Sequence, residues 1–500
     1  MSHCMTIYQD IAGLIEQALQ ARLIADEDEI YVRNQVLNHL HLKSYPERVG
    51  EATEDSIPNI LDKLVAYAIC ENIIEDVFDD KEMLAANIMN CFVARPSTVN
   101  EIFYGKYKQS PEAATEYFYR LSQNSNYIQT NRIKKNIHYK TESAYGEFDI
   151  TINLSKPEKD PEQIKREREI KTNIHYPKCL LCVENEGYTG RTGHPARANH
   201  RIIKVPLFEE NWYLQYSPYV YYNEHSILLA EEHRDMKISK QTFERLIAFT
   251  DKFPHYFIGS NADLPIVGGS ILSHDHYQAG RYEFAIDRAK SAFTFGIERF
   301  KEVRAQALKW PVSIIRLQSK DKMELVEAAD CIFQKWQVYH DEEVDIHALT
   351  DDTPHNTITP IARIRDGVYE LDLALRNNRT SEEHPLGVFH PHEDVHHIKK
   401  ENIGLIEVMG LAVLPARLKD ELEEVIEFLL GKGNQVADYH QEWANEIKEK
   451  HGPQSEREVA TELIQKELGD KFARVLEDAG VFKQTVEGLA AFKRFTDSLN

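Results

Sequence analysis

The sequence predicts an α+β protein of several domains, with a helical N-terminal part, a middle region of mixed strands and helices, and a helical C-terminal tail. Apolar residues recur at helical spacing up to about residue 130 and again from Ala416 onward. Between these regions the period of alternation changes to that of strands. Five hundred residues exceed what one hydrophobic core usually serves, and 42% apolar residues are enough to build more than one.

The N-terminal helices are predicted from apolar residues three and four positions apart, which lie on one face of a helix. Two such sets are Ile7, Ile11, Leu14, Ile15 and Ala18, and Leu61, Leu64, Val65, Ala68 and Ile69.

The first strand is predicted where Phe148, Ile150, Ile152 and Leu154 alternate with polar residues, the pattern of a half-buried strand. The charged segment 155–171 that follows is predicted to be an exposed connection.

The clearest order of elements lies between residues 226 and 280. We expect a strand at Ser226 to Ala230, a helix from about Ser239 that ends before Pro254, and a strand at Tyr256 to Ile258. Further strands are predicted at residues 312–317, 361–364 and 403–408.

The overall charge limits the partners of this chain. A formal net charge of -22 repels nucleic-acid phosphates and anionic lipid surfaces, so we expect neither a nucleic-acid nor a membrane partner. We find no basic stretch followed by an apolar run at the start and no apolar run long enough to span a bilayer, which predicts a cytoplasmic protein. Small anions remain possible ligands.

Cysteine spacing indicates a metal or redox site. In a chain without an export signal the six cysteines are expected to be reduced, and Cys179 and Cys182 form a Cys-x-x-Cys pair. Two thiolates at this spacing can bind one tetrahedral ion, but two more ligands are needed. Two reduced cysteines without a metal are the alternative, and a redox pair is disfavoured because no helix-opening pattern follows.

The segment 268–278, Gly-Gly-Ser-Ile-Leu-Ser-His-Asp-His-Tyr-Gln, is the most informative in the chain. In a strand, His274, His276 and Gln278 would share one face, and such a polar row is expected only where it meets a ligand or a metal. A neutral imidazole is a good nucleophile toward phosphorus, and the Gln278 amide can donate to a phosphate oxygen. The alternative is that the histidines only cap a strand or lie on a surface.

This segment resembles the His-x-His-x-Gln motif of the galactose-1-phosphate uridylyltransferases, members of the histidine-triad superfamily. The resemblance covers roughly residues 145–420, is strong from Cys179 to Gly280, and fits the second bacterial type of the family. It implies that His276 is the uridylylated nucleophile and that Gln278 binds phosphate. Asp275 departs from the proline that the better-known type carries there.

The resemblance also implies the remaining metal ligands and a fold. It offers His233 and His274 as partners of the two cysteines around a structural zinc. A second divalent ion at Glu283, His355, His390 and His392 is a weaker implication. The implied fold has two related histidine-triad-like halves with antiparallel sheets. We therefore predict domains at 1–140, 141–305, 306–440 and 441–500, and expect a homodimer.

Substrate-binding residues are implied by position within the same resemblance. Lys156 and Lys159 lie where the family often has two arginines, and Arg197 and Asn199 lie in its glycine-containing uridine loop. Asn261 and Ser270 match residues that bind phosphate and ribose. The residues that select the hexose could not be placed, because Glu407 is offset from the expected position.

The resulting functional hypothesis is exchange of UMP between UDP-glucose and galactose 1-phosphate by a ping-pong mechanism, with no organic cofactor. A nucleotide phosphorylase or hydrolase of the same superfamily is the first alternative. A zinc-stabilised binding protein without catalysis is the second.

Overall fold

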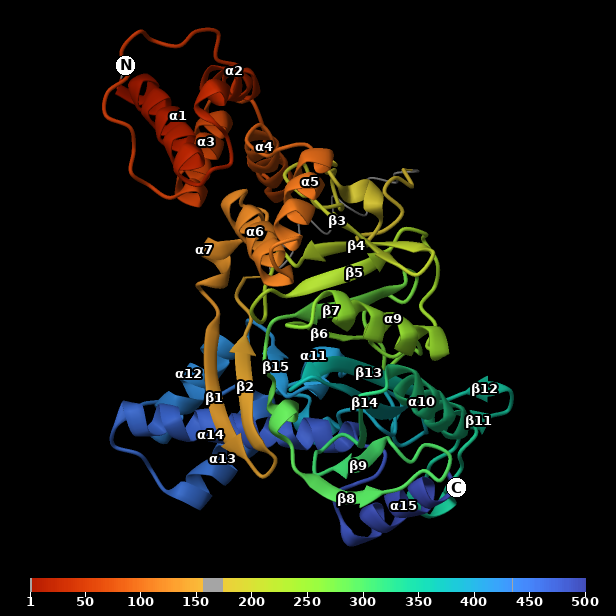
Figure 1. The fold of residues 1–500 in the computed structure, drawn as a ribbon. Helices are drawn as coiled ribbons and strands as arrows, with labels where there is room; N and C mark the ends of the chain where they lie inside the picture. Colours follow the sequence, from red (N-terminus) through yellow and green to blue (C-terminus); the bar gives the residue numbers. More distant parts are fainter. Residues whose placement is uncertain (1, 156–173, 434) are drawn as a thin grey trace. The chain divides into compact units, whose positions relative to one another are not determined.

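The computed structural model describes residues 2–155, 174–433 and 435–500. The chain divides into two compact units, the first formed by residues 1–134, 155–220 and 224–234, the second by residues 135–154, 221–223 and 235–500. Each unit combines helices with antiparallel strands, which confirms the α+β class (Figure 1). The four domain boundaries stay a prediction.

The first unit begins with helices, as predicted. They are α1 (Ser2–Gln20), α2 (Glu29–His39), α3 (Ile57–Cys70), α4 (Phe78–Asn90), α5 (Pro96–Tyr107), α6 (Pro111–Asn124) and α7 (Thr130–Ile133), with a short 3-10 turn at Asp26–Asp28. The predicted apolar faces of α1 and α3 pack into one hydrophobic core, in which Ile11, Leu14 and Leu64 are fully buried. Pro111 at the start of α6 and the Ser110 hydroxyl, which accepts from the Ala113 N–H, define where that helix begins.

The same unit contains an antiparallel sheet of β3 (Ile203–Leu207), β4 (Glu210–Tyr216) and β5 (Ser226–Ala230). The strand predicted at residues 226–230 is confirmed. Tyr216 at the end of β4 donates its hydroxyl to the Thr115 carbonyl of α6, which fixes the helices to the sheet.

The second unit is built on a long antiparallel sheet with the strand order β7-β6-β13-β14-β10-β9-β8. Its strands are β6 (Phe257–Gly259), β7 (His276–Gly280), β8 (Ser291–Phe295), β9 (Arg304–Leu308), β10 (Ile314–Ser319), β13 (Asn356–Arg365) and β14 (Val368–Asn377). Helices α9 (Lys240–Lys252) and α10 (Lys322–Gln337) pack on this sheet. The helix predicted from Ser239 is therefore confirmed. The strand predicted at 361–364 lies within β13, and those predicted at 256–258 and 312–317 overlap β6 and β10, which begin one and two residues later.

A smaller sheet in the second unit contains β1 (Ile137–Ser143), β2 (Gly146–Ile152) and β15 (Leu411–Leu414), with β2 in the middle. The strand predicted from Phe148 is present, but the expected half-burial is wrong, because Asp149 and Thr151 are also buried. Phe148 packs on Trp310 and Phe472, while Asp149 lies on the opposite face within 3.3 Å of His138. Both faces of β2 are therefore covered.

The strand predicted at residues 403–408 is wrong. This segment forms a loop and one helical turn, α11 (Leu405–Val408), and the strand β15 comes only after Gly410. The Glu407 carboxylate accepts from the Gly404 N–H and closes the turn. An apolar run that is buried on all sides carries no period, so it does not distinguish a helix from a strand.

The C-terminal helices are confirmed as α12 (Leu418–Leu429), α13 (Asp438–His451), α14 (Arg457–Ala479) and α15 (Val486–Asp497). Short elements complete the unit: β11 (Leu349–Thr350), β12 (Thr353–Pro354), and 3-10 turns at Ala285–Arg288, Glu342–Val344 and Glu393–Val395. Among the described helices, none combines the length and the apolar composition that a membrane crossing requires.

Candidate active site

The histidine motif lies at the start of β7. The strand begins at His276, and His274 lies in the bend before it, so the expected alignment on one strand face holds for His276 and Gln278 alone. The antiparallel partner β6 pairs Gly259 with Gln278. The side chains of His276 and Gln278 therefore share one face of the sheet.

The intervening residues point to the opposite face, toward α9. The Asp275 carboxylate lies 3.9 Å from the Arg245 guanidinium, and the Tyr277 ring is buried beside Arg245 and Thr242 of the same helix. Burial raises the pKa of Tyr277, and the Asp275 charge raises it further. Asp275 thus links the start of the strand to α9 through an ion pair.

His276 is held in one tautomer. Its Nδ1 lies 2.8 Å from the His274 carbonyl oxygen. Because a carbonyl only accepts hydrogen bonds, Nδ1 carries the proton and Nε2 keeps its lone pair. Burial lowers the pKa of His276 to about 4, although the hydrogen bond to His274 opposes this shift. The ring is therefore neutral at physiological pH, which is the form that can attack phosphorus.

Amide groups lie near this imidazole. The Gln278 Oε1 is buried and has no hydrogen-bond partner in the described part of the chain. Continued by two residues, the β6–β7 register sets Asn261 opposite His276. Asn261 accepts the Leu405 N–H through Oδ1 at 2.8 Å, which leaves its Nδ2 group as a donor. A side chain at Gly269 would lie 2.7 Å from that Nδ2, so glycine allows the loop to approach the amide.

The other substrate residues predicted from the sequence have different surroundings. Ser270 is exposed in a bend of the loop before β7. In the first unit, Asn199 donates its amide to the Ser125 carbonyl at 2.9 Å. The Arg197 guanidinium lies 5.4 Å from the centre of the Tyr127 ring, which stacks on His200. Lys156 and Lys159 lie outside the described residues.

The side chains of the predicted cysteine pair lie close to a histidine side chain in the first unit. The Cys179 and Cys182 sulfurs lie 3.5 Å apart, and the Cys182 sulfur lies 3.2 Å from His233 Nδ1. These ligand atoms lie within 4.8 Å of one another and form a group that can hold a metal ion. Ligand atoms around a tetrahedral zinc are about 3.7 Å apart, since zinc–sulfur bonds are about 2.3 Å long. The donor set and its spacing therefore fit zinc.

Asn185 shapes the Cys-x-x-Cys turn and was not singled out from the sequence. Its amide Nδ2 donates to the carbonyls of Cys179 and Cys182, both at 2.8 Å, and its Oδ1 lies 2.7 Å from His194 Nε2. The Leu181 N–H points at the Cys179 sulfur. An asparagine three positions after the second cysteine is the signal that could have indicated this role.

Two buried histidines beside this turn make the stability of the protein depend on pH. Burial lowers the pKa of His194 to about 4, with smaller effects of Arg191 and Arg197, and burial also lowers the pKa of His200. In the unfolded chain these rings take up protons near pH 6.5, but the folded protein keeps them neutral. The contribution of these histidines to the free energy of unfolding is therefore fully present above pH 6.5, and it is lost as the pH falls toward 4.

We expect His194 alone to contribute up to about 3 kcal/mol to this loss. In urea unfolding at pH 7, 6, 5 and 4.5, His194→Gln should show a shallower decline than the wild type. Glutamine keeps an amide donor for Asn185 but does not titrate. Identical pH profiles of the two proteins would contradict the assignment.

The second histidine cluster is not supported by the geometry. His355 hydrogen-bonds to Asn378 and Thr350, His390 to Asn402, and His392 lies beside Asp478. Glu283 is exposed and pairs with Arg288. Among the described residues, these groups do not converge on one position where an ion could bind.

Comparisons with known proteins identify the family. The family model for the N-terminal domain of galactose-1-phosphate uridyl transferase matches residues 22–235 of the sequence. The family model for the C-terminal domain matches residues 248–445. These matches define an enzyme of the transferase class. The chain belongs to the galactose-1-phosphate uridyl transferase family.

Similar proteins include galactose-1-phosphate uridylyltransferase of Clostridium perfringens strain 13, which is 53% identical over 493 residues and covers 98% of each chain. Galactose-1-phosphate uridylyltransferase 1 of Streptococcus pneumoniae serotype 4 is 51% identical over 489 residues, 98% of this chain and 99% of that protein. Among solved structures, yeast Ap4A phosphorylase matches at 12% identity with a TM-score of 0.35, over 66% of this chain and 90% of its own.

Proposed function

We propose that the chain exchanges UMP between UDP-glucose and galactose 1-phosphate through a covalent bond to His276. The observation that carries the proposal is the hydrogen bond from His276 Nδ1 to the His274 carbonyl, which leaves Nε2 as a nucleophile. Family membership and two nearly full-length relatives with this activity in their names support the same reaction.

In the first half-reaction, the Nε2 lone pair attacks the α-phosphorus of UDP-glucose. The bond from that phosphorus to the bridging oxygen breaks, and glucose 1-phosphate leaves with the electron pair. In the second half-reaction, a phosphate oxygen of galactose 1-phosphate attacks the same phosphorus, and the phosphorus–nitrogen bond breaks. UDP-galactose forms and Nε2 regains its lone pair, so no net proton transfer is required.

The amides near His276 suit this chemistry. Gln278 shares the strand face of His276, and its side-chain NH2 can donate to a phosphoryl oxygen as negative charge builds there. The Nδ2 group of Asn261 is a second donor of this kind. Neither side chain ionises, so both remain donors over the pH range in which His276 is neutral.

Uridylyl labelling tests the covalent step. UDP-glucose that carries radioactive carbon in uracil should leave about one label per chain in the absence of an acceptor, and the label should be acid-labile and base-stable, as a phosphorus–nitrogen bond is. Adding galactose 1-phosphate should release it as UDP-galactose. An unlabelled protein would contradict the proposal, and release as free UMP would favour the hydrolase alternative.

We propose zinc as the ion of the cysteine–histidine group, with Cys179, Cys182 and His233 as ligands and His274 as the fourth. A closed Cys2His2 set would be structural, and it would fix the residue whose carbonyl holds the His276 ring. A cytoplasmic homodimer is part of the same proposal, and light scattering during size-exclusion chromatography tests the dimer.

The contacts of Asn185 lead to a prediction about metal affinity. Asn185→Ala removes both hydrogen bonds that hold the carbonyls of the cysteine turn, and we expect about 10- to 100-fold weaker zinc binding. Competition with a chromophoric chelator measures the affinity. Asn38→Ala, at an exposed position of α2, is the matched control and should bind zinc as the wild type does. Equal affinities of the two variants would refute the role of Asn185.

A further inference from the structure

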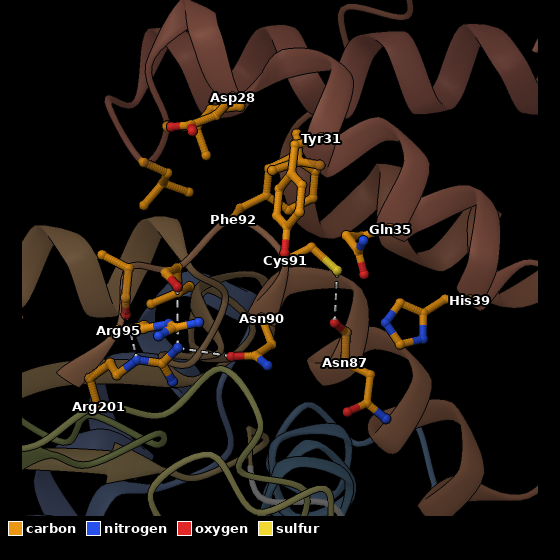
Figure 2. Close-up of a pocket in the computed structure, with 15 residues that line it drawn as sticks. Asp28, Tyr31, Gln35, His39, Asn87, Asn90, Cys91, Phe92, Arg95 and Arg201 are labelled. Atoms are coloured by element: carbon orange, nitrogen blue, oxygen red, sulfur yellow. Dashed lines mark hydrogen bonds between the residues drawn. The ribbon is translucent and has the colours of Figure 1, made fainter.

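A polar pocket lies in the first unit, between α2 and the turn that follows α4. Its volume is about 550 Å³. Figure 2 shows Tyr31, Gln35 and His39 along α2 on one side of the pocket, and Arg95 and Arg201 on the other. None of these residues was assigned a role from the sequence, and the proposed uridylyl transfer does not use them.

Arg201 places a buried positive charge at the wall of this pocket. The side chain is 8% exposed, and its donors are all directed at neutral oxygens. Nε donates to the Ala94 carbonyl, Nη1 to the carbonyls of Ala198 and His200, and Nη2 to Asn90 Oδ1 and the Val93 carbonyl. Burial lowers the pKa of Arg201, and the Glu186 charge only partly opposes this effect. A buried cation without a contacting carboxylate favours an anion in the adjoining space.

Arg95 supplies a guanidinium that is free to bind that anion. It is exposed and has neither an ion pair nor a side-chain hydrogen bond in the described part of the structure. Its planar fork matches two oxygens of a phosphate group. Asp28 is the one acidic residue among those that line the pocket, and its Oδ2 already accepts from the Ala25 N–H. The charge of the lining therefore favours a negative ligand, in a chain whose net charge is -22.

The rest of the pocket suits a polar organic body. The Gln35 and Asn90 side chains offer amide donors, and Tyr31 is 66% exposed at the pocket, where its ring presents a flat apolar face. Amides and an aromatic ring are groups that bind the hydroxyls and flat faces of sugars and nucleosides. The volume also exceeds what an inorganic anion needs.

We propose that this pocket is a second ligand site, which binds a phosphate monoester of a sugar or a nucleoside, with Arg95 on the phosphate and the α2 side chains on the organic part. Apart from Arg201, the residues that line the pocket lie between positions 23 and 95, and none of them belongs to the predicted uridine loop. None of the residues that line the pocket takes part in the proposed uridylyl transfer, so we assign its occupant as a ligand other than the UDP-sugar that reacts with His276.

Titration calorimetry of the full chain tests this with three probes: glucose 6-phosphate, AMP and inorganic phosphate. At least one probe should bind the wild type and lose at least tenfold in affinity in Arg95→Gln. Arg95 is exposed, so the variant should fold normally and keep its uridylyl-exchange rate. Arg48→Gln is the matched control, because Arg48 is exposed and does not line the pocket, and it should bind as the wild type does.

The pattern of binding identifies the source of the phosphate. If only glucose 6-phosphate shows Arg95-dependent binding, the ligand is a sugar phosphate. If only AMP does, the ligand is a nucleotide. If both organic probes do, the site recognises the phosphate monoester itself. Equal binding of all probes to the wild type and Arg95→Gln would overturn the proposal, as would Arg95-dependent binding of inorganic phosphate alone. Probe binding at the His276 site is common to both proteins, so it does not affect this comparison.

Discussion

Replacing His276 with asparagine is expected to lower the rate of uridylyl exchange by on the order of 10⁴- to 10⁶-fold, the range that follows when a covalent nucleophile is lost. Asparagine keeps a side-chain amide that can donate to the His274 carbonyl, but it has no nitrogen with a nucleophilic lone pair. The loss should therefore lie in kcat, with little change in the affinity for UDP-glucose. Exchange between radioactive glucose 1-phosphate and UDP-glucose measures it.

The control for this experiment is Gln278→Ala on the same strand face. It removes a donor to the phosphoryl oxygen but leaves the nucleophile, so we expect a loss of about 10²- to 10³-fold and a normal yield of labelled protein. His276→Asn should give no label at all. If the His276→Asn variant became labelled, or if its exchange rate were within tenfold of the wild-type rate, His276 would be excluded as the nucleophile.

The parts of the site that could be predicted are those in which the chemistry depends on spacing within a few residues. The two-residue gap between Cys179 and Cys182 brings both sulfurs into one group, and the two-residue period of a strand sets His276 beside Gln278. Both relations follow from local backbone geometry alone. The helical faces of α1 and α3 were predictable for the same reason, because the 3.6-residue period is read within one helix.

What could not be predicted depends on groups that meet through the tertiary structure or through the main chain. The hydrogen bond that selects the His276 tautomer ends on the backbone carbonyl of His274, and every residue has such a carbonyl. The turn at 405–408 is defined by Glu407 bonding to the Gly404 N–H, while the apolar residues around it suggested a strand. The pocket at Arg95 and Arg201 joins residues more than a hundred positions apart.

A buried ion network in the second unit is a further feature that only strand register reveals. Arg316 on β10 pairs with Asp372 on β14, and Arg363 on β13 pairs with Glu370. Arg316 binds the Asp372 carboxylate through Nε at 2.7 Å and Nη2 at 2.8 Å, and Arg363 also contacts it. Burial would raise the pKa of Asp372, but the two guanidinium groups outweigh this effect and hold it below its usual value.

Removing the central carboxylate of this network should therefore destabilise the second unit strongly. We expect Asp372→Ala to lower the free energy of unfolding by about 3–5 kcal/mol, because it leaves the Arg316 and Arg363 charges buried with too few partners. Urea unfolding followed by tryptophan fluorescence measures the change. Asp352→Ala, an exposed turn position, makes the same substitution without a buried partner and should change stability by less than about 0.5 kcal/mol. If both variants unfold at the same urea concentration, the network does not hold β10, β13 and β14 together, and apolar burial alone stabilises this sheet.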